Sequence, residues 1–332
     1  MKKIISLLLA LAMTVGLLAG CGQQNDTNQT NKLSIVTTIF PEYDWVKEIL
    51  GDKAEDAEVT MLLDNGVDLH SYQPTVDDIV KISDCDLFLY VGGESDGWVE
   101  DALKIAASKD RHVINLLEVL GDSVKEEETV EGMQAEVHDH EDADEHEEEA
   151  EYDEHVWLSL KNAETLVNAI SKSLQELDPA NKDTYSANSK AYAEKLSALD
   201  ADYQAAADSA DRKTILFGDR FPFRYLADDY GLDYYAAFPG CSAETEASFE
   251  TISFLAKKVD ELKLPCVLTI EGTQHKIAET IVQNTAQKSQ QVLTMDSMQA
   301  VTANDAASGV SYLSIMEKNL SVLKKALGQE AE

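Results

Sequence analysis

Residues 180–210 are the longest stretch of this 332-residue chain that can form one uninterrupted helix. The stretch is rich in Ala and contains no Gly or Pro, so it holds no strong helix breaker. At 1.5 Å per residue, a helix of about 30 residues is roughly 45 Å long, which is enough to cross between two lobes. Its apolar residues are spaced too irregularly for the heptads of a coiled coil. We therefore predict that this helix links two lobes of one protein.

Strand-like and helix-like segments alternate on both sides of the linking helix. Short runs of β-branched and other apolar residues, typical of buried strands, occupy residues 33–38, 58–63, 86–92 and 112–116 before it, and 214–218, 232–237, 266–270 and 292–295 after it. Such alternation indicates an α/β protein whose lobes contain parallel sheets. The predicted boundaries are 32–178 for the N-terminal lobe, 179–210 for the linking helix and 211–328 for the C-terminal lobe.

Residues 1–20 have the pattern of a secretory signal peptide. Two lysines follow Met1, and the apolar run at 4–18 is shorter than the about 20 residues of a membrane span. The run leads into Leu-Ala-Gly-Cys at 18–21, which resembles the lipobox of bacterial lipoproteins. We predict that Cys21 is lipidated and anchors the protein to the outer side of the cell membrane. The polar residues 21–31 would then form a flexible tether.

The formal net charge is −35, and 17 of the acidic residues lie within 122–154. This excess argues against nucleic acid and anionic surfaces as partners and favours cations. Within this acidic loop, His138, His140 and His146 alternate with carboxylates, and both side-chain types bind divalent metals. We predict an accessory metal-binding loop that is disordered without metal. A solvated acidic linker is the alternative.

Three cysteines follow Cys21, so at most one disulfide can form among them. Cys85 and Cys266 lie in strand-like apolar runs and are predicted to be small core residues. Cys241 lies in a loop, and the sequence assigns it no role. The chain contains no CxxC pair, which argues against a thiolate zinc site.

Two histidines follow strand-like or turn segments, where α/β sheets place ligands. His70 begins HSYQPT, and His155 lies in EHVWLSL directly after the acidic loop. Together with the lipobox, the long helix and YLADDYGL at 225–232, this arrangement resembles the high-affinity zinc/manganese solute-binding lipoproteins of bacterial ABC transporters. The resemblance covers nearly the whole mature chain. It implies two α/β lobes, a rigid helical linker, and a metal in the cleft that His70 and His155 bind from the N-terminal lobe.

The resemblance also implies ligands from the C-terminal lobe. Arg220 occupies the position of the family's third ligand, and a guanidinium has no free lone pair for a cation. We therefore predict that Asp219 replaces it; His275 and water are alternatives, as is a local Asp219–Arg220 ion pair with no role in binding. Glu271 matches the family's fourth, carboxylate position.

Two imidazoles with one or two carboxylates suit Zn²⁺, whereas further hard oxygen ligands would favour Mn²⁺. The predicted protein is a monomeric receptor that captures zinc, or alternatively manganese, and delivers it to an ABC permease and its ATPase. It is not predicted to be an enzyme, because HExxH, GxSxG and HxxEH signatures are absent from the sequence. An extracellular zinc hydrolase and a surface metal store or adhesin are the alternatives from other classes.

Overall fold

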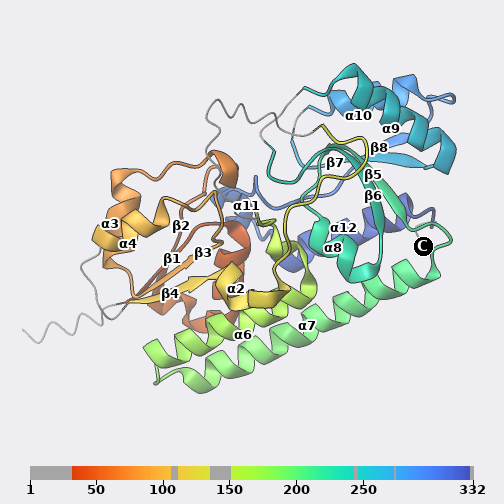
Figure 1. Ribbon diagram of the computed structural model, residues 1–332. Helices are drawn as coiled ribbons and strands as arrows, with labels where there is room; N and C mark the ends of the chain where they lie inside the picture. Colours follow the sequence, from red (N-terminus) through yellow and green to blue (C-terminus); the bar gives the residue numbers. More distant parts are fainter. Residues whose placement is uncertain (1–31, 106–110, 135–150, 243–245, 273, 330–332) are drawn as a thin grey trace, which may run out of the picture. The chain divides into compact units, whose positions relative to one another are not determined.

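The computed structural model describes residues 32–105, 111–134, 151–242, 246–272 and 274–329 (Figure 1). The chain divides into two units, Met1–Lys32 and Leu33–Glu332, and the following concerns the second. The predicted signal peptide, Cys21, and the tether lie outside the described residues, as do His138, His140 and His146. Among the described helices, none is long and apolar enough to cross a membrane.

The N-terminal lobe is built on a four-stranded parallel sheet with the order β2-β1-β3-β4. Its strands are β1 (Leu33–Thr37), β2 (Ala57–Met61), β3 (Leu87–Tyr90) and β4 (His112–Asn115). The helices of this lobe are α2 (Phe40–Leu50), α3 (Val76–Asp84), α4 (Val99–Ile105) and α5 (Leu116–Leu120). Helix α3 begins where it does because the Thr75 hydroxyl accepts from the backbone N–H of Asp78, and the Asp78 carboxylate accepts in return from Thr75.

The C-terminal lobe repeats this topology in a second parallel sheet with the order β6-β5-β7-β8. Its strands are β5 (Thr214–Arg220), β6 (Asp233–Phe238), β7 (Cys266–Thr269) and β8 (Gln291–Thr294), and its helices are α8 (Arg224–Tyr230), α9 (Phe249–Leu262), α10 (Lys276–Asn284), α11 (Ala303–Ala307) and α12 (Tyr312–Ala326). A Cβ on Gly218 would lie 2.5 Å from the Cα of Ala278, so only glycine lets β5 and α10 approach this closely. The predicted α/β class with two parallel-sheet lobes is confirmed.

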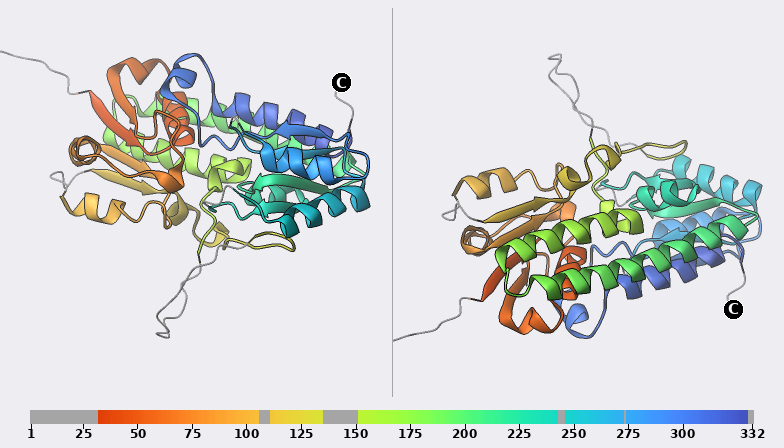
Figure 2. Two further views of the ribbon diagram at one scale, coloured as in Figure 1. Left: turned by 90° about the horizontal axis from the view of Figure 1, so that it is seen from above. Right: turned by 90° about the horizontal axis from the view of Figure 1, so that it is seen from below.

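Helices α6 (Leu160–Leu177) and α7 (Lys182–Ser209) run side by side (Figure 2). Helix α7 has 28 residues and contacts α2 and α6 as well as α8 and α12. Asn188 donates to the carbonyl of Ile49 at 3.0 Å, and the Tyr203 hydroxyl donates to the carbonyl of Met316 at 2.7 Å. The helix that the sequence indicates therefore packs against elements of both lobes.

The lobes are also joined away from α7. The backbone N–H of Tyr312 donates to Asp44 at 2.9 Å, and its hydroxyl donates to the carbonyl of Trp157 at 2.7 Å. The rings of Trp45 and Tyr312 pack edge to face at 5.2 Å, and one buried apolar cluster contains residues of both lobes. Helix α12 thus returns to the N-terminal lobe and adds a second connection that the sequence did not indicate.

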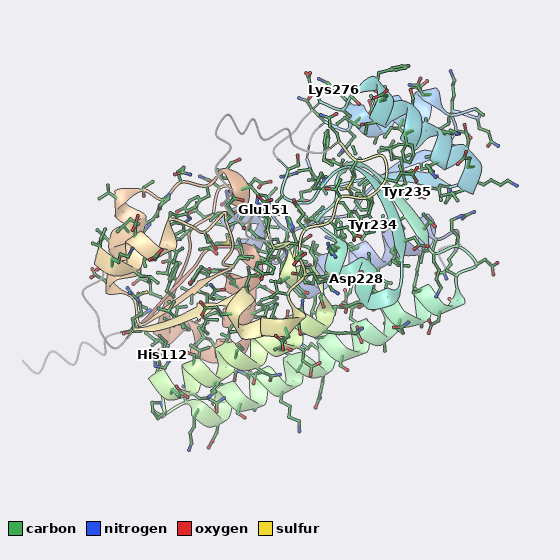
Figure 3. All side chains as sticks on the ribbon, viewed as in Figure 1. His112, Glu151, Asp228, Tyr234, Tyr235 and Lys276 are labelled. Atoms are coloured by element: carbon green, nitrogen blue, oxygen red, sulfur yellow. The ribbon has the colours of Figure 1, made fainter. Side chains whose placement is uncertain are left out.

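The two described ends of the acidic loop, residues 124–134 and 151–154, form what we call the acidic arms. The arms pair through two backbone bonds: the Glu127 N–H donates to the Glu151 carbonyl at 2.8 Å, and the Asp153 N–H donates to the Lys125 carbonyl at 2.9 Å. The first arm then crosses to the C-terminal lobe, where Gln134 N–H donates to the Ala237 carbonyl at 2.9 Å. Figure 3 labels Glu151 on the second arm. The prediction of a disordered loop is therefore wrong for the arms, because backbone bonds hold them; residues 135–150 lie outside the described part.

Replacing the buried acid Glu42 with Gln should weaken the pH dependence of stability. Burial and the nearby Asp96 raise the pKa of Glu42 from 4.5 to about 8. The folded chain keeps a proton that the unfolded chain loses, so stability present at low pH is lost as the pH rises from 4.5 to about 8. Glu42→Gln removes this loss. Between about pH 5 and pH 9, the free energy of unfolding should fall by on the order of a few kcal/mol more in wild type than in the variant. Urea unfolding at each pH measures it.

The comparison isolates Glu42 because other buried acids with raised pKa values, among them Asp44, Asp96 and Glu154, are present in both proteins. Equal losses of stability in wild type and Glu42→Gln would contradict the prediction.

Candidate metal centre

The two predicted histidines lie in short turns that an aspartate holds in the same way. In the turn Leu69–Ser71, the Asp68 carboxylate accepts from the backbone N–H of His70 at 3.0 Å. The Asp153 carboxylate accepts from the backbone N–H of His155 at 2.9 Å. The aspartate stands two residues before the histidine in both cases, so Asp-x-His is a local sequence signal of these turns. The His70 side chain is 8% exposed, and His155 is fully buried.

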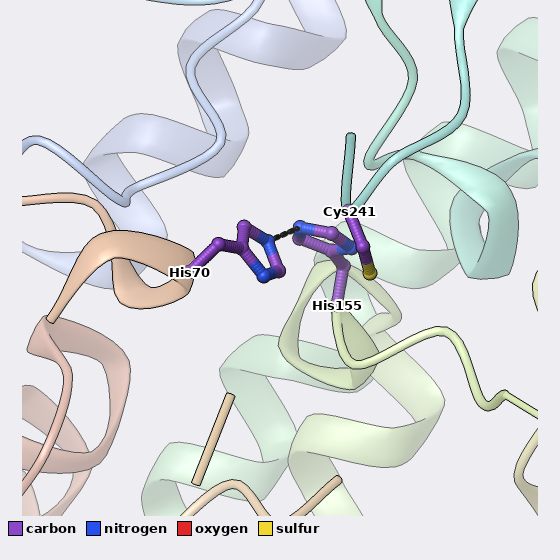
Figure 4. Close-up of side chains that lie close together, drawn as sticks. All are labelled: His70, His155 and Cys241. Atoms are coloured by element: carbon purple, nitrogen blue, oxygen red, sulfur yellow. Dashed lines mark hydrogen bonds between the residues drawn. The ribbon is translucent and has the colours of Figure 1, made fainter. Parts of the chain in front are cut away.

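The two rings face each other across the contact between their turns (Figure 4). The Nε2 atoms of His70 and His155 are 3.2 Å apart. Two nitrogen ligands at 2.0–2.1 Å from a tetrahedral zinc ion would lie about 3.3–3.4 Å apart. The sequence-predicted pair is therefore brought together with the spacing that zinc ligands require.

The other ring nitrogens are held from behind by buried polar groups. His155 Nδ1 lies 3.0 Å from Asp153 Oδ1. His70 Nδ1 lies 2.8 Å from the Ser95 hydroxyl and 3.5 Å from Glu154 Oε2. A carboxylate that accepts the Nδ1 proton leaves the Nε2 lone pair free for a metal and fixes the orientation of the ring. This is the arrangement expected behind metal-binding histidines.

The electrostatics of the site favour the neutral form of His70. Burial and, to a smaller extent, the neighbouring His155 lower the pKa of His70 to about 3, and Arg220 acts in the same direction. Because a metal binds the unprotonated imidazole, His70 is already in the binding form at neutral pH.

Cys241 is the third potential ligand in this group. One ligand atom from each of His70, His155 and Cys241 lies within 4.8 Å of the other two, and Figure 4 shows the three side chains. Cys241 follows strand β6 in the C-terminal lobe. A Cβ on the preceding Gly240 would lie 3.2 Å from the His155 ring, so glycine permits the close approach of this loop. Burial, with the carboxylates of the acidic arms, raises the pKa of the Cys241 thiol.

Cys241 carries no local signal in the sequence, because it is remote from both histidines in the chain and has no CxxC partner. Only the fold brings it to them. Cys85 and Cys266 are buried, as predicted for core residues, and all three described cysteines are free.

The predicted carboxylate ligands are described and lie outside this group. Glu271 accepts hydrogen bonds from the backbone N–H and hydroxyl of Ser297 at 2.6 and 2.7 Å, and from the backbone N–H of Gln299 at 3.0 Å. Asp219 accepts from the backbone N–H of Arg220 at 2.9 Å, and burial raises its pKa. Asp219 and Glu271 stay predictions as metal ligands.

Arg220 makes a different contact from the one that the sequence suggested. Its guanidinium lies 2.5 Å from the Asp68 carboxylate of the N-terminal lobe instead of pairing locally with Asp219. A second nitrogen of the same group donates to the carbonyl of Ser242 at 3.4 Å. Arg220 therefore connects the turn that carries His70 with the loop that carries Cys241.

Two further histidines lie outside the group. His275 stands just before helix α10, and its buried Nδ1 has no hydrogen-bond partner among the described residues. The Nδ1 of His112 at the start of β4 lies 2.7 Å from the Ser173 hydroxyl of α6, and Figure 3 labels it beside that helix.

Comparison with known proteins shows similarity along almost the whole chain. The family model described as "Zinc-uptake complex component A periplasmic" matches residues 35–326. The zinc-binding lipoprotein AdcA of Streptococcus pneumoniae is 33% identical over 330 residues, which are 99% of this chain and 62% of AdcA. The chain thus spans less than two thirds of that relative. The high-affinity zinc uptake system protein ZnuA of Bacillus subtilis is 30% identical over 96% of this chain and 97% of its own length.

A solved structure has the same fold. The crystal structure of the Zn(II)-bound ZnuA-like domain of Streptococcus pneumoniae AdcA matches with a TM-score of 0.68 and 30% identity. The match covers 90% of this chain and 100% of that domain.

Proposed function

Because the chain belongs to the family of periplasmic A components of zinc-uptake complexes, we propose that it is a receptor that captures Zn²⁺ outside the cytoplasm and delivers it to an ABC permease. The observation that carries the proposal is the pair of facing Nε2 atoms of His70 and His155, 3.2 Å apart, with a hydrogen-bond partner behind each ring, Ser95 for His70 and Asp153 for His155. The family is described by a role in uptake and not by a reaction, so zinc is the cargo of this site.

Capture in this site depends on orientation and charge. The acceptors behind Nδ1 aim both Nε2 lone pairs at one point between the lobes, so little ordering is needed when the ion arrives. Because the pKa of His70 is lowered, its imidazole is neutral at neutral pH and needs to lose no second proton before a metal binds. Imidazole suits zinc, whereas manganese prefers carboxylate and carbonyl oxygens. Since no described carboxylate lies in the group, the geometry favours Zn²⁺ over the manganese alternative.

The predicted setting of the receptor follows from the N-terminal sequence and the relatives. Leu-Ala-Gly-Cys at residues 18–21 follows an export signal, and AdcA is named a lipoprotein. We propose that Cys21 anchors the protein to the membrane beside its permease and ATPase, and that it works as a monomer.

Deleting residues 135–150, which contain His138, His140 and His146, tests whether the acidic loop is the tight site. We expect the deletion to change the affinity of the tightest zinc site by less than about tenfold, or 1.4 kcal/mol, because the facing histidines lie outside it. The additional zinc ions that wild type binds with lower affinity should no longer bind to the deletion variant. Competition with a zinc chelator measures the first quantity, and equilibrium dialysis at higher zinc measures the second.

Loss of tight binding in the deletion variant would support the metal-store alternative and contradict the proposal. As a control for transport, zinc-limited bacteria that lack their own receptor should accumulate zinc with the deletion variant and fail to do so with a His70→Ala, His155→Ala double variant.

A further inference from the structure

We propose that Cys241 is the third protein ligand of this site and binds zinc as a thiolate. The inference rests on the proposed function and deepens it, because it assigns the site two imidazole nitrogens and one sulfur. Such a donor set selects borderline and soft metal ions over Mn²⁺.

The first argument is distance. The ligand atoms of His70, His155 and Cys241 are within 4.8 Å of one another. At a Zn–S distance of about 2.3 Å and a Zn–N distance of about 2.0–2.1 Å, sulfur and nitrogen ligands of a tetrahedral ion would be about 3.6 Å apart. The group therefore needs to contract by at most about an ångström on binding.

The second argument is that contacts from both lobes hold the Cys241 loop beside the histidines. The backbone N–H of Cys241 donates to Glu127 of the acidic arm at 2.9 Å. The next carbonyl, that of Ser242, accepts from Arg220, whose guanidinium also pairs with Asp68 in the turn of His70. Glycine at 240 leaves room for the His155 ring. The position of the thiol is thus fixed relative to both imidazoles.

The third argument is buried negative charge around the group. Asp153 and Glu154 are 2% and 1% exposed. Glu154 Oε2 has no hydrogen-bond donor among the described residues and lies 3.5 Å from His70 Nδ1. Burying a carboxylate whose negative charge has no full set of hydrogen bonds or opposite charges around it costs free energy. A divalent cation compensates for it even after Cys241 adds a thiolate, and the thiol proton leaves to solvent as the Zn–S bond forms.

The fourth argument is that the Glu271 carboxylate is engaged in hydrogen bonds with another segment of the chain. Its carboxylate accepts three hydrogen bonds from Ser297 and Gln299. The Ser297 carbonyl in turn accepts from the indole N–H of Trp157 at 2.9 Å, two residues after His155. Glu271 therefore supports the segment that carries His155, and leaving that position would break all three bonds.

Cobalt substitution of the full chain tests the proposal. The Co²⁺-loaded wild type should show a near-ultraviolet thiolate-to-cobalt charge-transfer band, and Cys241→Ser should lose it. Cys266→Ala, which removes another thiol, should keep the band. The zinc affinity of Cys241→Ser should fall by more than about 100-fold, whereas Glu271→Gln, which changes a residue that supports the His155 segment, should lower it by no more than the about 10- to 100-fold cost of an outer partner.

A measurement on the wild type makes the test independent of any variant's folding. Zinc should protect Cys241 from alkylation by iodoacetamide, as quantified by mass spectrometry of the peptide that contains it. Absence of the band in wild type, persistence of the band in Cys241→Ser, or equal alkylation with and without zinc would each overturn the proposal.

The outcomes also separate this inference from the proposed function. If His70→Ala and His155→Ala abolish tight binding while Cys241→Ser does not, the histidine site stands and only the thiolate is refuted. If the histidine variants bind zinc as wild type does, the site itself is wrong.

Discussion

His155→Ala should lower the zinc affinity of this chain by more than about 100-fold, because removing only an outer partner of a metal ligand already costs about 10- to 100-fold. His155 is fully buried, and its Nε2 lies 3.2 Å from that of His70. Alanine removes the ligand and leaves Asp153 as a buried carboxylate without its imidazole partner. His70→Ala should have an effect of similar size. Competition with a chelator of known affinity measures both.

His112→Ala is the matched control, since it removes an imidazole of the same lobe whose contact is the Ser173 hydroxyl. Its zinc affinity should stay within about tenfold of wild type. Urea unfolding of the metal-free proteins separates lost ligation from lost structure. Tight binding retained in His155→Ala would refute the assignment.

Trp157→Ala should lower the free energy of unfolding by about 3–5 kcal/mol, the usual cost of truncating a buried Trp. Trp157 is 1% exposed, and its indole N–H donates to the Ser297 carbonyl of the C-terminal lobe. Its own carbonyl accepts from the Tyr312 hydroxyl at 2.7 Å. The substitution therefore leaves a cavity and an unpaired carbonyl at a contact between the lobes. Urea unfolding in the presence of a chelator measures the effect without metal linkage.

Phe249→Ala provides the comparison for Trp157, because Phe249 is 79% exposed. Its substitution should change stability by less than about 0.5 kcal/mol. Zinc affinity should also fall in Trp157→Ala, since the indole packs on the His155 ring at 5.3 Å. A loss of stability no larger than that of Phe249→Ala would show that Trp157 is not part of the cooperative core.

His155 and Trp157, the residues of these two predictions, belong to one connected set of contacts. Glu271 holds Ser297, Ser297 accepts from Trp157, and the Trp157 ring packs on His155. Glu271, which the family resemblance suggests as a ligand, is thus connected through Ser297 and Trp157 to the segment that carries His155. Residues of the C-terminal lobe thus contact the segment of the N-terminal lobe that carries His155.

Local patterns in the sequence were sufficient for the class of fold. Alternating strand-like and helix-like segments predicted two parallel-sheet lobes, and a segment without Gly or Pro predicted the long helix that is observed as α7. Helical and strand periodicity depends on neighbouring residues, so it can be read without the tertiary structure. The return of α12 to the N-terminal lobe depends on the contact of Tyr312 with Asp44, and no local pattern reports such a contact.

His70 and His155 were recognisable because each stands in a distinctive motif, and the preceding aspartates at two residues' distance form a local signal as well. Sequence alone thus determined the class of the protein, and it predicted the two imidazoles of the site and a preference for cations. The tertiary structure decided which other side chains lie near these imidazoles. Cys241 approaches the histidines, Arg220 pairs with Asp68, and Glu271 bonds to Ser297. Each of these contacts joins residues at least 26 positions apart, so their geometry depends on how the lobes pack and not on local spacing.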